Sequence, residues 1–305
     1  MLHDDEGNLY GTTSAGGSSP DCSGDAYPGC GTVFKLDKQG HITVLHSFTG
    51  GADGTAPWSL IRDSAANLYG TAVFGAVPSC YYGCGTVFKL DAANNMTVVH
   101  SFNGLDGSEP RSLLRDGAGS LYGTSSYFKD GAYGPGFIFK IDISGNETIL
   151  YNFKGYPDGS GPWGTLLRDP KGTLTLYGTT LGGGAYDAGT IFTLTPKRQE
   201  TIVHSFSGID GSIPLSGLIR DEAGNLYGAT QLGGDLSCYD GAGCGVIFKF
   251  DPAGNLTVLH AFAGYPDDGA EGTYGNLVRD SAGNLYGATP SGGAFNAGTI
   301  YKLSP

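Results

Sequence analysis

The chain has 305 residues and a formal net charge of −12, and its 17 Lys and Arg residues do not gather in a cluster. Nucleic acids and anionic membranes bind basic patches, so this charge argues against both as partners. No stretch approaches the ~18 consecutive apolar residues of a membrane span, so we expect no membrane insertion within this chain. Glycine is frequent, at 54 residues. Because tyrosine, phenylalanine and β-branched residues recur between the glycines, the composition predicts many short strands and turns.

A four-part unit repeats along the chain with a period of ~50 residues. Its second copy contains the strand-like runs SLIRD, NLYGTA, GTVFKL and TVVHSF, which we name strands A to D. The six copies span approximately 1–48, 57–102, 110–153, 162–206, 214–262 and 273–305. Four strands this short cannot bury a core alone, but a radial array of such sheets can. We therefore predict an all-β fold, a six-bladed β-propeller of four-stranded antiparallel blades that forms one domain over residues 1–305.

The chain begins inside strand A of the first copy and ends before any strand D of the sixth. We therefore expect the last blade to lack its outer strand. Because the chain begins inside one repeat and ends inside another, we also expect it to be a fragment of a longer protein. Neither an export signal nor an anchor is visible in it.

The connections between strands differ in length. The A–B and C–D turns are short, whereas the B–C and D–A connections contain the long and variable sequence. In an up-and-down blade, the two long connections lie on one face. Function is often located in loops on a rigid scaffold, so this loop face is where we expect a binding site.

The six cysteines form three local pairs, each inside a B–C connection: Cys22 with Cys30, Cys80 with Cys84, and Cys238 with Cys244. Such pairs predict disulfides and an oxidising compartment. Zinc is the alternative, but structural zinc sites usually need two pairs of ligands, and only Cys80 and Cys84 approach the usual spacing.

The motifs LYGTT, GTVFKLD, TVLHSF and LIRD..GN, which recur across the whole chain, resemble those of the choice-of-anchor GloVer tandem-repeat family of bacterial secreted or surface proteins. The resemblance implies an exported protein that is extracellular or held at the cell surface. It implies no catalytic residues.

Two groups of residues are candidates for ligand binding. Shortly after the Asp-Gly step that precedes strand A, the copies diverge, and we expect these residues at the channel mouth: Trp58, Arg111, Trp163 and Tyr274. The B–C connections add aromatic residues: Tyr27, Tyr81, Tyr82, Tyr133, Tyr186 and Tyr239. Aromatic faces among Gly, Ser and Asp suit stacking on sugar rings or the anchor residues of a protein partner. The alternative is that these rings pack on one another.

The acidic candidates are weaker. An aspartate recurs in the D–A connection, at Asp53, Asp106, Asp158, Asp210 and Asp267. A recurring Asp at a turn usually fixes that turn by hydrogen bonds, and a Ca²⁺ site is the alternative. Glu109 and Glu271 lie beside the divergent positions and are candidate catalytic carboxylates.

The sequence favours a monomeric secreted or surface propeller that binds a glycan or surface protein, without turnover and without a required cofactor. The first alternative is a lyase or hydrolase that acts on polysaccharides or lactones. The second is a structural adhesion or spacer module.

Overall fold

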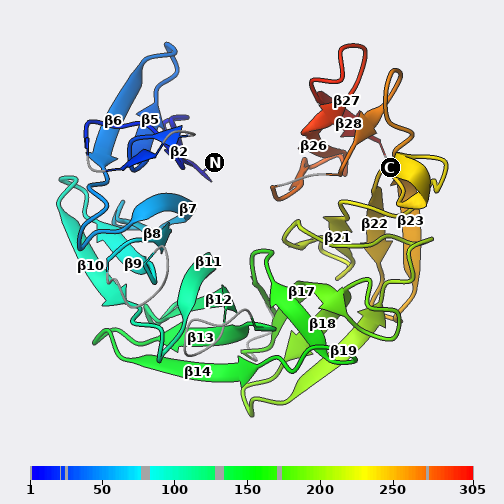
Figure 1. The fold of residues 1–305 in the computed structure, drawn as a ribbon, viewed down its shortest axis with the longest axis horizontal. Coiled ribbons are helices and arrows are strands. Elements are labelled where there is room, and N and C mark those ends of the chain that lie inside the picture. The colour runs from blue at the N-terminus through cyan, green and yellow to red at the C-terminus, as the bar shows by residue number, and fades with distance from the viewer. Residues whose placement is uncertain are drawn as a thin grey trace. The chain divides into compact units, whose positions relative to one another are not determined.

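The computed structural model describes residues 2–20, 22–24, 27–76, 83–127, 134–169, 174–272 and 275–304. Apart from the 3₁₀ helix η2 (Tyr239–Gly241), the regular structure of these residues is β-strand (Figure 1). Within these ranges we find no helix with the length and apolarity that a membrane crossing requires. The chain divides into two compact units, Met1–Leu150 and Tyr151–Pro305.

The first unit contains three antiparallel sheets, which correspond to the first three sequence repeats. In strand order they are β1 (Leu2–His3), β2 (Leu9–Thr13), β5 (Thr32–Leu36) and β6 (Ile42–Ser47); β7 (Thr55–Arg62), β8 (Leu68–Phe74), β9 (Thr86–Leu90) and β10 (Met96–Ser101); β11 (Ser108–Arg115), β12 (Leu121–Tyr127), β13 (Phe137–Ile141) and β14 (Glu147–Asn152). A hairpin of β3 (Ser23–Gly24) and β4 (Tyr27–Pro28) lies in the first B–C connection.

The second unit contains the sheets of the last three repeats. They are β15 (Gly159–Pro162) and β16 (Leu167–Arg168), both paired with β17 (Leu176–Gly183), then β18 (Thr190–Leu194) and β19 (Glu200–Ser205); β20 (Ile219–Arg220), β21 (Leu226–Ala229), β22 (Val246–Phe250) and β23 (Leu256–Ala261); β24 (Gly269–Ala270) with β27 (Ser291–Gly292); and β25 (Val278–Arg279), β26 (Leu285–Thr289) and β28 (Thr299–Leu303). In the described part of the sixth repeat, β28 is the last strand.

Strands A to D of the first five repeats, and strands A to C of the sixth, are hydrogen-bonded neighbours in chain order. This is the up-and-down order predicted from the loop lengths. Each of the six repeats thus forms one blade of small antiparallel sheet structure, and the predicted six-bladed β-propeller is confirmed. That the whole chain is one domain remains a prediction.

The core is built from a glycine of strand B, an aromatic residue of strand C and a phenylalanine of strand D. A Cβ atom on Gly123 of strand B would lie 2.3 Å from the ring of Phe139 in strand C, so glycine provides the space for that ring. Phe102 of the preceding strand D packs edge-on against Phe139, with 5.3 Å between ring centroids. The same contact joins Phe48 with Phe88 and Phe206 with Phe248. Blades two to six therefore bury strand C against strand D of the blade before.

Aspartates organise the short turns. In the A–B turn before β26, Asp280 accepts hydrogen bonds from the backbone and side chain of Asn284 and from the Tyr286 hydroxyl. These bonds, with that from the Asn284 side chain as the largest contribution, lower the pKa of Asp280 to about 2. The recurring DxxxN and LYG motifs thus serve the same turn, so they report on fold and not on ligand binding.

Candidate functional site

In the first unit, three of the predicted residues contact one another on the innermost strands. Trp58 lies in β7 and Arg111 at the equivalent place in β11, and each strand has a β-bulge there, between Pro57 and Leu60 and between Pro110 and Leu113. Bulges redirect side chains and are frequent beside binding sites. The guanidinium carbon of Arg111 is 5.3 Å from the ring centroid of Trp58, a cation–π contact.

Glu109 completes this group, which we call the Trp58 cluster (Trp58, Glu109 and Arg111). Its carboxylate accepts a hydrogen bond of 2.9 Å from Arg111, and both side chains are largely buried. Burial raises the pKa of Glu109, and the positive charge of Arg111 opposes that rise. Trp58 remains 42% exposed. The cluster therefore presents an aromatic ring to solvent on top of a buried, internally neutralised ion pair.

Hydrogen bonds from threonine side chains of neighbouring B strands to the backbone hold the cluster in place. The Thr12 hydroxyl donates to the Trp58 carbonyl, and the Thr71 hydroxyl donates to the Arg111 carbonyl, at 3.3 and 3.1 Å. Each threonine belongs to the blade before the one it contacts. The ring and the guanidinium are thus supported by strands and not by mobile loops, which favours a preformed site.

In the second unit the corresponding strands are less regular. Trp163 is half-buried between β15 and β16, where the innermost strand of the fourth blade is interrupted. The equivalent Leu215 is buried. Glu271 follows β24 and has a left-handed backbone, with φ of 64°, like Glu109 at 52°. The proposed roles of Trp163 and Glu271 remain predictions.

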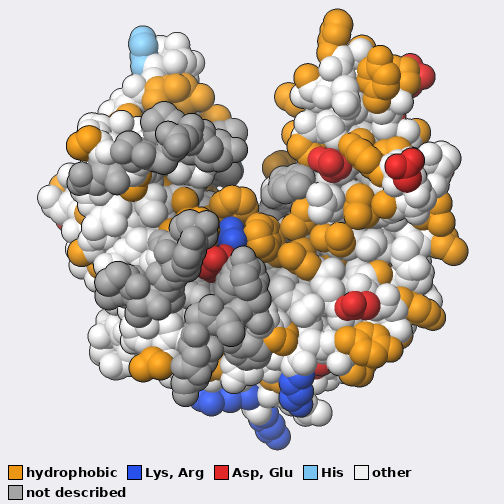
Figure 2. Space-filling view, in the orientation of Figure 1, with side chains coloured by type: hydrophobic (Ala, Val, Ile, Leu, Met, Phe, Trp, Pro, Cys, Tyr) orange, Lys and Arg blue, Asp and Glu red, His pale blue; other side chains and the backbone are white. Residues whose placement is uncertain are grey.

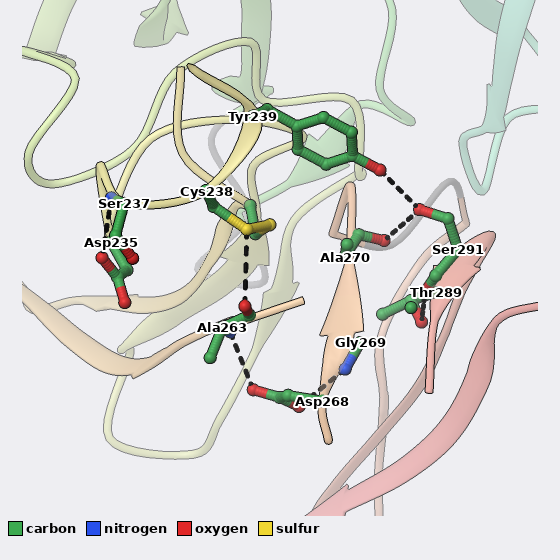
Figure 3. Close-up of a disulfide and its surroundings, with 12 residues drawn as sticks. Asp235, Ser237, Cys238, Tyr239, Ala263, Asp268, Gly269, Ala270, Thr289 and Ser291 are labelled. Atoms are coloured by element: carbon green, nitrogen blue, oxygen red, sulfur yellow. Dashed lines mark hydrogen bonds between the residues drawn. A yellow bond between two sulfur atoms is a disulfide. The ribbon is translucent and has the colours of Figure 1, made fainter. Parts of the chain in front are cut away.

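The predicted loop aromatics are described in part. Tyr186 is 67% exposed and Tyr239 is 46% exposed. The Tyr239 hydroxyl is 3.1 Å from the Ser291 hydroxyl of the next blade, so this ring is anchored at its polar end (Figure 3). The backbone of Tyr27 lies in β4, and its side chain is outside the description. Tyr81, Tyr82, Tyr133 and Tyr274 lie outside the described residues.

Exposed hydrophobic side chains are scattered over the face that Figure 2 presents, and Lys and Arg side chains are few on it. Among the exposed hydrophobic side chains of the described residues, Phe295 in the B–C connection of the sixth blade is 92% exposed. This surface agrees with the acidic composition and is unlike the basic patch of a nucleic-acid-binding protein.

The disulfide prediction is confirmed for the described cysteines. Cys22 is bonded to Cys30 and Cys238 to Cys244, with Cα–Cα distances of 5.1 and 5.5 Å. Cys84 is also disulfide-bonded, while Cys80 lies outside the described residues. The Cys238 sulfur lies 3.5 Å from the Ala263 carbonyl oxygen in the D–A connection (Figure 3). This bridge therefore fixes the B–C loop of the fifth blade where it meets the D–A loop.

We expect a thiol titration of the folded, unreduced protein to find no reactive thiol, because the cysteines are consumed in bridges. The same titration after reduction under denaturing conditions should find six. Six reactive thiols in the unreduced protein would contradict the disulfides and would remove the main support for export.

The recurring aspartates of the D–A connection are engaged in turn hydrogen bonds. Asp53 contacts the His46 ring nitrogen at 3.0 Å and accepts from the Thr49 backbone. Asp158 bonds Tyr151 in the same way, and Asp210 bonds His204. Asp106 lies 3.3 Å from His100. In the fifth repeat, the aspartate that bonds the strand D histidine, His260, is Asp268 and not the neighbouring Asp267.

These contacts satisfy the carboxylates locally. Within the described residues, no group of three or more His, Cys, Asp and Glu side chains is placed to hold a metal ion. The hydrogen bonds that these aspartates make are those of residues that fix a turn.

The sheets and their connections define the class of protein as a β-propeller. The profile of the Gloeobacter/Verrucomicrobia repeat matches residues 1–175 and again residues 127–305. The chain belongs to this repeat family, which confirms the resemblance read from its motifs. No curated protein matches the sequence.

Several solved structures share the fold. A virginiamycin B lyase from Staphylococcus aureus is 11% identical with a TM-score of 0.62, covering 100% of this chain and 80% of its own. A streptogramin B lyase is 13% identical with a TM-score of 0.56, covering 97% and 87%. A gluconolactonase from Xanthomonas campestris is 16% identical with a TM-score of 0.51, covering 84% and 74%. At such low identity the likeness concerns the fold alone.

Proposed function

We propose that the protein is a secreted or cell-surface β-propeller that binds a glycan or a protein through its loop face, without turnover. The observation that carries this proposal is the Trp58 cluster, an exposed tryptophan ring supported by a buried Arg–Glu pair on bulged strands. An aromatic face held rigid beside polar groups suits a sugar ring or an apolar side chain of a partner.

The location outside the cytoplasm is supported by the disulfides and the repeat family. Disulfides form and persist mainly in oxidising compartments. The bridged loops would also keep exposed tyrosines such as Tyr239 in place, which lowers the entropy lost on binding.

The proposal predicts that Trp58→Ala weakens binding of a glycan or protein ligand at least tenfold, about 1.4 kcal/mol. The ligand would first be found with the wild-type protein on a glycan array and by pull-down of surface extracts, and its affinity measured by calorimetry. Trp163→Ala, measured separately, shows whether the equivalent position in the second unit contributes. Ile143→Ala is a matched control, because Ile143 is exposed in a short C–D turn.

Equal affinity of the wild type and Trp58→Ala would exclude Trp58 as a contact. Turnover would argue for a different function. If the wild type released reducing ends or unsaturated products from a bound glycan, the lyase or hydrolase alternative would be favoured, with Glu109 as the candidate acid. The two lyases and the lactonase of similar fold are the reason to include this assay.

A further inference from the structure

Blades share a repeated arrangement of a lysine and a tyrosine on the sheet side that faces the next blade. The strand C lysine is in register with the strand B tyrosine, and its ammonium nitrogen lies over the tyrosine ring. The distances to the ring centroid are 6.0 Å for Lys35 and Tyr10, 5.8 Å for Lys89 and Tyr69, 5.7 Å for Lys140 and Tyr122, and 5.9 Å for Lys302 and Tyr286. These are cation–π distances.

An arginine of the following blade approaches the same ring. Arg115 lies 5.3 Å from the centroid of Tyr69 and 4.0 Å from the carboxylate of Asp63. Tyr69 thus interacts with two cations at once, Lys89 and Arg115, with a carboxylate close by. The arrangement shows that this place in the fold accommodates an ammonium group even when the arginine is present.

The fourth blade has the tyrosine, and the following blade supplies the arginine, but the lysine is absent. Thr193 is in register with Tyr177, where the other five repeats have a lysine. Arg220 lies 5.6 Å from the Tyr177 centroid and 3.3 Å from the carboxylate of Asp169. The ammonium is therefore the component that this blade has lost.

A groove of about 490 Å³ opens where the lysine is missing. Thr193, Tyr177 and Asp169 of the fourth blade line it, together with Leu226, Phe250 and the turn Asp251–Gly254 of the fifth. Asp169 and Asp251 lie in an A–B and a C–D turn. The groove is therefore at the short-turn side of these blades, away from the long loops that the proposed function uses.

We propose that this groove binds a primary alkylammonium group, in the position that a lysine side chain occupies in the sibling blades. The ammonium would lie over the Tyr177 ring beside the Asp169 carboxylate, and its methylene chain would contact Leu226 and Phe250. The charge of Arg220 is balanced by its ion pair with Asp169, as that of Arg115 is by Asp63. The net charge of −12 adds a long-range attraction for cations.

The chemistry fits two sources, a free aliphatic amine and a lysine side chain of a peptide. Calorimetric titrations with n-butylammonium and with Nα-acetyl-lysine amide separate them, since a site that needs peptide groups binds only the second. We expect saturable binding of one equivalent with a Kd of about 1 mM, from the aromatic, carboxylate and methylene contacts together. Nε-acetyl-lysine amide, which lacks the charge, should bind at least tenfold more weakly.

Thr193→Lys should fill the groove with the protein's own ammonium and weaken n-butylammonium binding at least tenfold. Thr97→Lys is the matched control, because it adds the same charge at an exposed threonine of β10 and should bind as the wild type does. Thr193→Met fills the groove without a charge and gives a second blocked variant, should Thr193→Lys fail to fold. The proposal is overturned if the wild type shows no saturable amine binding, if both blocked variants bind like the wild type, or if acetylation of the amine has no effect.

Discussion

Replacing Glu147 with methionine is expected to raise the free energy of unfolding at pH 8 by about 1–2 kcal/mol, after allowance for the partial exposure of this side chain. Burial raises the pKa of Glu147 to about 7, while the nearby His100 lowers it and Asp106 raises it. One carboxyl oxygen, Oε1, is buried and has no hydrogen-bond partner. The equivalent strand D positions hold Ile42, Met96 and Leu256 besides Glu200, so three of the five copies have an apolar side chain here.

The pH dependence provides the sharper measurement. The carboxyl titrates near 4.5 in an unfolded chain and near 7 in the folded one, so the folded state binds the proton more tightly. Stability contributed by this group is therefore present below pH 4.5 and is lost as the pH rises towards 7. Urea unfolding of the wild type and Glu147→Met should show a difference that grows over this interval and is constant above it.

Two further variants test the assignment. Glu200 occupies the same place in the fourth blade, and burial raises its pKa to about 7 as well, so Glu200→Leu should behave in the same way. Glu222 is exposed in a turn, and Glu222→Met should leave stability within about 0.5 kcal/mol of the wild type. A Glu147→Met variant that is less stable than the wild type at pH 8 would show that the carboxylate makes a stabilising contact.

Replacing Phe139 with alanine is expected to lower the free energy of unfolding by about 3–5 kcal/mol, as for other buried phenylalanines. Phe139 is fully buried and has the Phe102 and Phe137 rings at 5.3 and 6.2 Å. The loss of the ring leaves a cavity above Gly123, which has no side chain to fill it. Chemical unfolding followed by circular dichroism measures the effect.

Phe295→Ala provides the matched control, because that ring is 92% exposed. Its removal should change stability by less than about 0.5 kcal/mol. Similar losses for Phe139→Ala and Phe295→Ala would contradict the assignment of the strand C phenylalanines to the core.

The fold could be predicted because every copy repeats the same physical solution. The glycine of LYG, the phenylalanine of VFK and the aspartates of the turns recur wherever the same contact must be made, so their spacing specifies strands, order and blade number. The prediction of Asp267 in the fifth repeat was wrong by one residue, because the adjacent Asp268 makes the contact with the histidine. Two adjacent carboxylates cannot be distinguished without the turn geometry.

The candidate site could be predicted only in part, since exposure is decided by neighbours. Trp58 and Leu215 hold equivalent places, yet one is exposed and the other buried. Arg111 contacts both Trp58 and Glu109 where the strands have β-bulges, and these bulges cannot be predicted from the sequence. The sequence has Thr193 where the other five repeats have a lysine, but the groove beside it depends on the positions of Tyr177 and Arg220 in two blades.

The pairing of each strand D phenylalanine with strand C of the following blade means that no repeat closes its own core. Phe102 belongs by sequence to the second repeat but by packing to the third, next to Phe139. The segment that can be duplicated or deleted without breaking these contacts is therefore offset from the sequence repeat by one strand. A duplication or deletion that begins just before a strand D and ends just before the next would keep every aromatic pair intact, whatever the number of blades.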